Sequence, residues 1–377
     1  MVGNRSAGTS LFDLLARAWT LDDEVVQTGF NRADSAVYFR LQSGKLALAT
    51  TRDSESPKSR TRIETDTGRT TIRQRENPIP EARIIPIALN AELPIVRFGE
   101  NGFMAVDADG VPHQITAQGQ CIEKANSIVG PQITSLCSDR SGETLAIAGP
   151  LSICVYKASS LQVLAEIDIE RHISCMAFSA DGEQLAAWGE GSLTLIDKKN
   201  PASAIHHIDG INEVSQINWD SSGNYLSCTA NTHAFWIVDA NAGTARIIEG
   251  YPGKVKIATF NEAGKALVTS GAFRLAGWST EDLPGKDHPG TPLSSGKPGM
   301  VIVNTLAAHP KRSLVAVGYP DGLVTISSVG TPEEMMVHKE NGTEVNDLAW
   351  SDTGEHLSIA FKSGKAAVVT FPDKLFK

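Results

Sequence analysis

Short runs in which apolar and polar residues alternate recur along the chain, and they indicate β-strands. Residues 173–178 have the period of two that a half-buried strand requires. A tight turn follows, in which a glycine can supply a positive φ angle without steric cost. A second apolar strand at 185–188, a third at 193–196 and a more polar fourth strand, as at 244–248, complete the unit. The pattern predicts units of four antiparallel strands, each forming one small twisted sheet.

One spacing marks the turn between the first two strands of each unit. An aromatic residue is followed by glycine four positions later and by leucine seven positions later. Four clear copies are Phe178, Gly182 and Leu185; Trp219, Gly223 and Leu226; Phe260, Gly264 and Leu267; and Trp350, Gly354 and Leu357. Four weaker copies keep the spacing: Ser138, Gly142 and Leu145; Ala307, Lys311 and Leu314; Phe30, Asp34 and Val37; and Leu89, Leu93 and Val96. The chain therefore contains eight predicted units.

The distance between units is nearly constant in the middle of the chain. First strands begin near Ile133, Ile173, Val214 and Val255, at spacings of 40, 41 and 41 residues. A period of ~40–45 residues with four strands per repeat is typical of β-propellers. We therefore predict an all-β fold, a β-propeller of eight four-stranded antiparallel blades. Seven blades are the alternative, because the first two units match the pattern least well.

The repeat resembles the WD40 family. The resemblance rests on the eight frames and on third strands that end in aspartate, at Asp107, Asp197 and Asp239. It covers about residues 25–377. It is degenerate, because no unit has the Gly-His pair before its first strand or the Trp-Asp pair at the end of its third strand. The resemblance implies a protein-interaction scaffold whose ring is commonly closed by an N-terminal strand.

Two regions fall outside the regular repeat. We expect residues 1–24 to form an N-terminal segment and residues 25–377 to form the propeller, with a basic polar insertion at 54–80. Residues 11–20 fit either a strand that completes the last blade or a short helix, and both alternatives stay open. The Pro- and Gly-rich stretch 283–299 is expected to be a loop between blades.

The insertion is basic although the protein is acidic. The chain carries 34 Lys and Arg against 43 Asp and Glu, a net charge of −9, which argues against a protein that wraps nucleic acid. Between Arg52 and Arg75, however, seven basic residues face four acidic ones. No aromatic residue lies among the basic ones, so stacking on bases is not indicated. We interpret the insertion as an exposed, mobile hairpin, with docking to an acidic partner or nucleic acid as the alternative.

The cysteines and the apolar runs indicate in which cellular compartment the protein is located. Five cysteines at wide spacings, with no C-x-x-C pair, favour reduced thiols over disulfides or a zinc site. No segment has the pattern of a secretory signal or a membrane-spanning helix. We expect a cytoplasmic protein with no membrane span, present as a monomer or as a subunit of a complex.

Signatures of catalysis are missing from the sequence: it contains no Gly-x-Ser-x-Gly, P-loop, HExxH or EF-hand motif. Polar residues near the start of several inner strands could surround a channel mouth with oxygen ligands that Ca²⁺ accepts: Asn212, Glu213, Asn304, Glu344 and Asn346. An ordinary polar rim is the favoured interpretation. We predict a non-catalytic scaffold without cofactor or metal, and the alternative is a propeller enzyme with a metal-assisted site at the channel mouth.

A protein partner is expected on one face of the disc, formed by the loops before each first strand and between each second and third strand. The candidates before first strands are Arg171, His172, Asn212 and Lys254, and those between second and third strands are Trp188, His233, Arg274, Tyr319 and Lys362. All nine should lie on the same side. For Trp188 the alternative is packing between blades, and Lys254 and Lys362 could simply be solvated charges.

Overall fold

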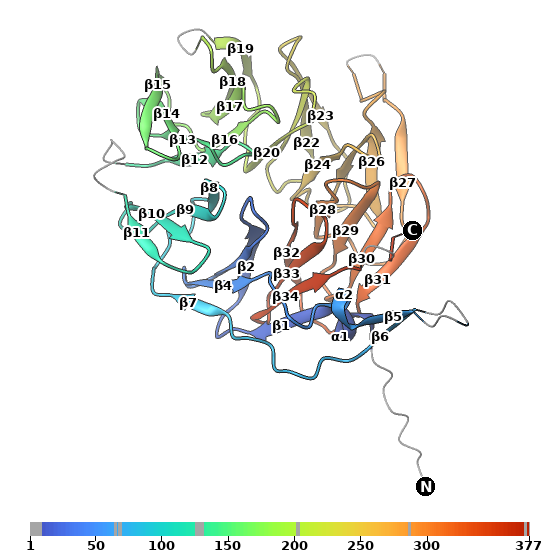
Figure 1. The fold of residues 1–377 in the computed structure, drawn as a ribbon. Coiled ribbons are helices and arrows are strands. Elements are labelled where there is room, and N and C mark those ends of the chain that lie inside the picture. The colour runs from blue at the N-terminus through green and yellow to red at the C-terminus, as the bar shows by residue number, and fades with distance from the viewer. Residues whose placement is uncertain are drawn as a thin grey trace.

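Eight four-stranded antiparallel sheets follow one another around a ring (Figure 1). The structure, a computed structural model, describes residues 10–63, 66, 70–124, 132–200, 204–285, 288–372 and 375–376. The all-β propeller is therefore confirmed, and of the two blade counts considered, eight is correct.

The first four blades come from the N-terminal half of the chain. Blade 1 comprises β2 (Val25–Phe30), β3 (Ala36–Leu41), β4 (Leu46–Thr50) and β7 (Arg83–Ile85). Blade 2 comprises β8 (Val96–Phe98), β9 (Gly102–Val106), β10 (Pro112–Thr116) and β11 (Cys121–Glu123). Blade 3 comprises β12 (Ser135–Ser138), β13 (Thr144–Ala148), β14 (Ser152–Lys157) and β15 (Gln162–Asp168). Blade 4 comprises β16 (Cys175–Phe178), β17 (Gln184–Gly189), β18 (Ser192–Asp197) and β19 (Ala204–Asp209).

The last four blades complete the ring. Blade 5 comprises β20 (Gln216–Trp219), β21 (Tyr225–Thr229), β22 (Phe235–Asp239) and β23 (Thr244–Ile248). Blade 6 comprises β24 (Ala258–Asn261), β25 (Ala266–Thr269), β26 (Leu275–Ser279) and β27 (Pro292–Ser295). Blade 7 comprises β28 (Thr305–Ala308), β29 (Leu314–Gly318), β30 (Val324–Ser328) and β31 (Glu334–His338). Blade 8 comprises β32 (Val345–Trp350), β33 (His356–Phe361), β34 (Lys365–Thr370) and β1 (Ala16–Thr20).

The frame glycines lie in the turns between first and second strands. Gly142, Gly182, Gly223 and Gly354 have φ between 71° and 75°, the left-handed region that glycine enters without strain. Asp34 takes the same role in blade 1 with φ 51°. Aspartate is among the few residues with a side chain that tolerate this region.

Two of the predicted frames are wrongly positioned. In blade 2 the predicted frame 89–96 ends where β8 begins, and the turn lies between Phe98 and Gly102. In blade 7 the frame begins one residue later than predicted, because Ala308 pairs with Val315. Both units lack the aromatic and glycine residues of the frame at the predicted positions, so the spacing alone did not fix the register.

The hydrophobic core consists of eight clusters, and each lies between two neighbouring blades. Ile153 and Phe178, for example, belong to the cluster between blades 3 and 4. Blades 8 and 1 share a cluster around Phe39 in the same way. Burial of apolar surface at every junction therefore holds the ring together.

The N-terminal segment supplies the outer strand of the last blade. Leu11–Leu15 forms α1, and β1 follows directly and pairs antiparallel with β34, with Ala16 opposite Val369 and Thr20 opposite Lys365. Figure 1 shows β1 in blue beside the red strands of blade 8. The segment for which helix and strand were alternatives thus contains one after the other. No helix in the described part of the chain is long and apolar enough to cross a membrane.

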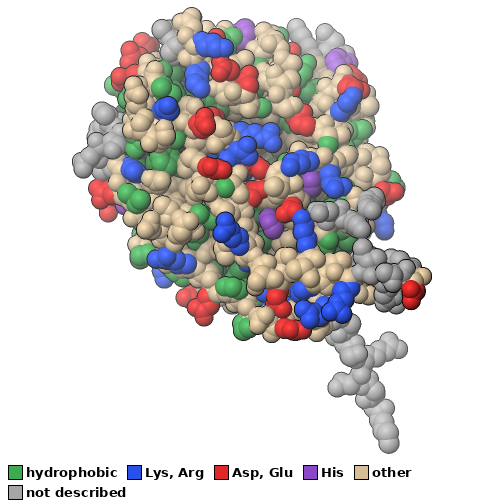
Figure 2. All heavy atoms as spheres, viewed as in Figure 1, with side chains coloured by type: hydrophobic (Ala, Val, Ile, Leu, Met, Phe, Trp, Pro, Cys, Tyr) green, Lys and Arg blue, Asp and Glu red, His purple; other side chains and the backbone are tan. Residues whose placement is uncertain are grey.

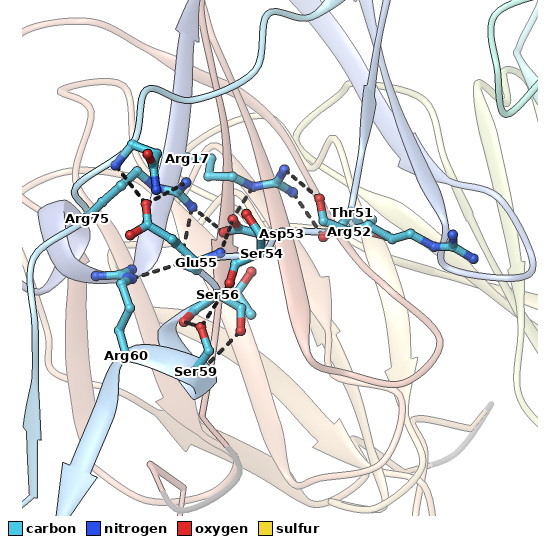
Figure 3. A network of polar contacts seen from close by, with 12 residues as sticks. Arg17, Thr51, Arg52, Asp53, Ser54, Glu55, Ser56, Ser59, Arg60 and Arg75 are labelled. Carbon is cyan, nitrogen blue, oxygen red and sulfur yellow. Dashed lines mark hydrogen bonds and ion pairs between the residues drawn. The ribbon is translucent and has the colours of Figure 1, made fainter.

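The insertion between β4 and β7 begins against β1 (Figure 3). The Arg17 guanidinium, from β1, donates hydrogen bonds to the carbonyls of Thr50 at 2.7 Å and Thr51 at 3.2 Å. It also lies 3.8 Å from the Asp53 carboxylate, and Arg17 is only 2% exposed. This buried charge connects the closing strand to the start of the insertion.

The rest of the insertion contains α2 (Pro57–Arg60), β5 (Thr61–Ile63) and β6 (Thr70–Ile72), and a second arginine anchors it. Arg60, 4% exposed, donates to the carbonyls of Leu14 at 2.6 Å and Glu55 at 2.8 Å. Arg75 forms ion pairs with Asp53 and Glu55. Both arginines appear in Figure 3 pointing into this network.

The described part of the insertion is a short hairpin of β5 and β6 on a base that is only partly buried: Arg60 is buried, whereas Lys58, Arg62 and Arg73 are exposed. Arg60 and Arg75 are held internally, and Lys58 and Arg73 form ion pairs with Glu355 and Glu76. Figure 2 shows basic and acidic side chains interspersed over the face in view. The described part of the insertion thus gives no support to a continuous basic docking surface.

The stretch 283–299 also differs from expectation. It contains β27, the outer strand of blade 6, whose first residue is Pro292. Proline is tolerated in an outer strand because its missing N–H would face outward. The irregular part of the stretch is therefore divided into a loop before β27 and a loop after it.

Candidate protein-interaction face

The antiparallel connections bring two sets of loops to one face of the ring. In each blade the loop before the first strand and the loop between the second and third strands emerge at the same end of the sheet. The nine predicted residues lie on these loops or at adjoining strand ends, distributed over blades 4 to 8. We call this side the loop face.

Two of the nine cannot be exposed anchors. Trp188 is 8% exposed, and its Nε1–H donates to the carbonyl of Ile211 at 2.8 Å. It belongs to the cluster between blades 4 and 5, so the packing alternative applies. Tyr319 is 6% exposed in the cluster between blades 6 and 7, and burial raises its pKa to about 12. Both side chains turn sideways into a neighbouring blade.

The other seven reach the surface to different degrees. Arg171 is half-buried, and the exposed residues are His172, Asn212, His233, Lys254, Arg274 and Lys362. Asn212 and His233 line one cavity of about 470 Å³ on blade 5, where His233 Nδ1 lies 2.9 Å from the Tyr251 carbonyl oxygen. Lys254 and Arg274 share blade 6. The structure therefore brings together two pairs rather than one continuous set.

The channel mouth is occupied by contacts between blades. Asn304 donates from Nδ2 to Glu344 Oε1 at 2.9 Å and to the Val345 carbonyl at 2.8 Å. The Lys256 ammonium lies 3.3 Å from Glu344 Oε1, and the Lys362 ammonium lies 3.7 Å from its Oε2. The carboxylate that was a candidate metal ligand is thus paired with two cations.

Asn346 repeats this arrangement one blade further on. Its Nδ2 donates to Glu24 Oε1 at 2.9 Å and to the Val25 carbonyl at 2.8 Å. Asn212 and Glu213 lie exposed on blade 5. Within the described residues, no group of three or more His, Cys, Asp or Glu side chains could hold a metal ion. Three of the five candidate residues, Asn304, Glu344 and Asn346, thus contact a neighbouring blade, whereas Asn212 and Glu213 lie apart from them on blade 5.

The channel itself contains a cavity of about 510 Å³, lined by inner strands of blades 3 to 8. Polar side chains on its wall include Gln216, Thr259 and Asp347. Burial raises the pKa of Asp347 to about 7, even though its carboxylate accepts hydrogen bonds from the backbone N–H groups of Thr28 and Leu348, both at 2.9 Å. The channel wall thus carries a carboxyl group that titrates near neutral pH.

Three loops at blade 6 contact one another: the loop from blade 5 into blade 6, the loop between the second and third strands of blade 6, and the loop from blade 6 into blade 7. We call their residues 250–257, 270–274 and 296–304 the blade-6 platform. The Gly253 N–H donates to the Gly271 carbonyl at 2.9 Å, and the Gly271 N–H donates to the Val303 carbonyl at 3.0 Å. The Gly299 N–H donates to the Phe273 carbonyl at 2.9 Å. Backbone hydrogen bonds therefore fix the three loops relative to one another.

The platform depends on a glycine at its centre. Gly271 has φ 88°, which a residue with a side chain rarely adopts. A Cβ atom there would lie 3.0 Å from the Gly253 carbonyl oxygen and 3.1 Å from that of Lys254. Glycine is thus required both for the backbone conformation and for the close approach of the first two loops.

Large apolar side chains are exposed on the platform. Phe273 is 46% exposed and Met300 is 93% exposed. Leu151, 71% exposed, lies on the same face in blade 3. The other exposed large apolar residues of the described chain all lie on outer strands: Ile84, Ile122, Val163, Leu164, Ile205, Ile247 and Met336. Among the described loops, exposed apolar anchors therefore occur on the loop face alone.

Sequence reasoning missed Phe273 and Met300. Phe273 stands directly before the predicted Arg274, at the tip of a loop between a second and a third strand, so the signal was available. Met300 follows the Pro- and Gly-rich stretch, where no alternation indicates which side chains are buried. Its neighbour Gly299 is hydrogen bonded to Phe273, a contact between residues that lie far apart in the repeat.

Comparison with protein-family models gave no match, and comparison with curated protein sequences gave none either. Among solved structures, the C-terminal WD40 domain of Sif2 matches with a TM-score of 0.61 and 13% identity, covering 95% of this chain and 99% of that chain. A chain in the mitotic checkpoint complex matches with a TM-score of 0.58 and 18% identity, covering 77% and 94% respectively.

The β-propeller domain of Myceliophteria thermophila Cps50 (Swd1) matches with a TM-score of 0.53 and 16% identity, covering 74% of this chain and 95% of that chain. Identities this low establish the fold alone. Together with the eight sheets, they show that this chain folds as an eight-bladed β-propeller similar to those of WD40 domains.

Proposed function

We propose that the chain is a non-catalytic scaffold that binds a partner protein through its loop face. The observation that carries the proposal is the exposure of Phe273 and Met300 on two loops joined by a backbone hydrogen bond. Exposed apolar side chains on a rigid support are typical anchors of protein interfaces, because their burial by a partner is favourable and costs little ordering.

The chemistry of the platform agrees with this role. Methionine is flexible and polarizable, and it adapts to partner surfaces of different shape. Phenylalanine contributes a large apolar area with few rotatable bonds. Of the similar folds, one belongs to a multiprotein assembly, the mitotic checkpoint complex, which supports an interaction role by analogy. In this proposal the chain itself carries out no reaction.

The proposal includes a cytoplasmic location, as a monomer or as a subunit of a complex. All five cysteines are unpaired, which suits a reducing compartment. Cys137 and Cys228 are buried, and desolvation raises the pKa of both thiols well above the usual range, so neither is reactive. Fractionation of cells that express the tagged chain tests the location.

The test of the scaffold compares two variants in affinity capture from the protein's own cell extract. Phe273→Ser with Met300→Ser removes the anchors on the platform. Leu164→Ser with Met336→Ser is the matched control, since these side chains are 50% and 54% exposed on outer strands. We expect the platform variant to retain less than about a tenth of the partner captured by wild type, and the control to retain it.

Quantitative mass spectrometry measures the captured proteins, and thermal unfolding checks that both variants are as stable as wild type. Equal recovery with the platform variant and the control would contradict the proposal. Because the exposed positions make few internal contacts, neither variant should lower stability noticeably.

A further inference from the structure

We propose that the blade-6 platform binds an acidic peptide segment that carries a large apolar side chain. This inference rests on the proposed function and adds the chemical class of the partner. Its basis is the charge of the platform, which is opposite to that of the whole protein.

The platform residues include four cations and no acidic residue, and one carboxylate, the exposed Glu249, directly precedes them in the first loop. The cations are Lys254, Lys256, Arg274 and Lys297, whereas the whole chain has a net charge of −9. A local positive region in an acidic protein attracts and orients a partner of opposite charge.

Three of these cations are available to a partner. Lys254, Arg274 and Lys297 are exposed, and none has an ion pair with a described residue. Lys256 differs, because it contacts Glu344 at the channel mouth. The platform thus presents three side-chain cations with no ion pair to a described residue, and the Glu334 carboxylate accepts a hydrogen bond from the Lys297 backbone N–H at 3.0 Å.

The cations lie beside the apolar anchors. Arg274 directly follows Phe273, and Lys297 precedes Met300 by three residues on the neighbouring loop. Lys254 follows Gly253, which is hydrogen bonded to Gly271 on the Phe273 loop. An apolar centre with a charged rim is the usual composition of a protein interface.

The same features favour a peptide over a nucleic acid. Single-stranded nucleic acids bind to grooves in which several aromatic side chains stack with successive bases. The platform exposes one phenylalanine and one methionine, and methionine offers no flat ring for stacking. An apolar peptide side chain would bury both, while carboxylates of the same peptide would reach the three cations.

The experiment selects peptides from a random 12-residue phage library on the immobilised full-length chain. We expect the selected peptides to be enriched in Asp and Glu around one Leu, Phe or Trp. A synthetic peptide of the selected sequence, labelled with fluorescein, then gives the dissociation constant by anisotropy. Raising the salt concentration from about 50 to about 200 mM should weaken binding several-fold, because exposed charges are screened.

Three variants separate the contributions of platform charge, overall charge and apolar anchors to peptide binding. Lys254→Glu, Arg274→Glu and Lys297→Glu together should weaken binding by more than about tenfold. Lys157→Glu, Lys199→Glu and Lys311→Glu produce the same change in net charge at exposed positions on the connections of the opposite face, and binding should persist. Phe273→Ser with Met300→Ser tests the anchors on which the proposed function rests.

Each outcome decides a claim. The inference of an acidic partner would be overturned if the selected peptides are neutral or basic, or if they bind the platform charge-reversal variant as well as wild type. If such peptides still require Phe273 and Met300, the scaffold proposal stands. Failure to select any peptide that depends on the platform would overturn both. A mixed-sequence 12-nucleotide single-stranded DNA serves as a second probe, and platform-dependent binding of DNA instead of peptide would also overturn the inference.

Discussion

At the scale of single residues, two aromatic side chains near the loop face differ in exposure to solvent. Trp188 is the penultimate residue of β17, and its side chain is buried between blades 4 and 5 with a hydrogen bond from its indole. Phe273 lies in a loop and remains 46% exposed. Trp188 is buried because its side chain turns into the neighbouring blade, whereas the Phe273 side chain, at the tip of its loop, is only partly covered by the adjoining loops.

This contrast predicts different effects on stability. Trp188→Ala should lower the free energy of unfolding by about 3 kcal/mol, since a large buried side chain leaves a cavity. Phe273→Ala should change it by less than about 0.5 kcal/mol, because few internal contacts are lost. Urea unfolding followed by intrinsic fluorescence and by circular dichroism measures both. Equal losses in the two variants would contradict the assignment of Trp188 to the core and Phe273 to the surface.

At the scale of the elements, regular blades could be predicted and the exceptions could not. Where an aromatic residue, a glycine and a leucine all occupy the frame, as at Trp219, Gly223 and Leu226, the turn lies where the spacing places it. In blades 2 and 7 fewer of these residues are present. Several apolar spacings then fit equally well, and only pairing with the neighbouring strand selects one.

The site was predicted only in part for a related reason. The sequence pointed to the correct loops, but exposure of a side chain in a loop depends on contacts with other loops. Met300 follows Gly299, which is hydrogen bonded to Phe273 on another loop, and Tyr319 is buried against blade 6. Neither contact has a signature in the local sequence. The same holds for Arg17, whose partners lie on the insertion.

The contacts of Arg17 predict how the closing strand β1 is held. Arg17→Met keeps an unbranched side chain of similar length but removes the donors to Thr50 and Thr51 and the partner of Asp53. Breaking one side of a buried charged network should cost about 3 kcal/mol. The loss should be local, so hydrogen exchange measured by mass spectrometry should accelerate in β1 and in the first residues of the insertion.

Arg62→Met provides the matched control for this prediction, since Arg62 is an exposed arginine of the same insertion. It should exchange like wild type in β1. If Arg17→Met leaves exchange in β1 unchanged, the insertion does not stabilise the closing strand.

At the scale of the whole molecule, strands β1 and β34, from opposite ends of the fold, pair in blade 8, and the last two blades hold two buried histidines, His309 and His338, and a partly buried one, His356. His309 lies in the first turn of blade 7, His338 ends its outer strand, and His356 begins β33. Burial lowers the pKa of His309 and of His356 to about 4, and burial likewise lowers the pKa of His338. Nearby cations, Arg312 for His309 and Lys365 for His338, act in the same direction.

These shifts make the stability of the ring sensitive to acid. The unfolded chain binds protons at histidine below about pH 6.5, whereas the folded chain binds them at His309 and His356 only near pH 4. Stability is therefore expected to fall as the pH decreases from about 6.5 to about 4. Asp347 acts in the opposite sense, because its raised pKa favours the folded state as the pH falls from about 7 towards 3.8. Three histidines with a lowered pKa destabilise the folded chain at low pH, and one carboxyl group with a raised pKa stabilises it. The net effect of lowering the pH is therefore a loss of stability.

Thermal unfolding by circular dichroism between pH 7 and about pH 4.5 tests this balance, and the midpoint should decrease. His309→Asn should flatten the decrease, since asparagine can still accept the hydrogen bond that His309 Nδ1 accepts from the Lys311 N–H at 3.0 Å but does not take up a proton. Asp347→Asn should steepen it, because the opposing group is removed. A midpoint that stays constant over this range, or a decrease that is identical in all three proteins, would mean that these groups do not set the pH dependence of stability.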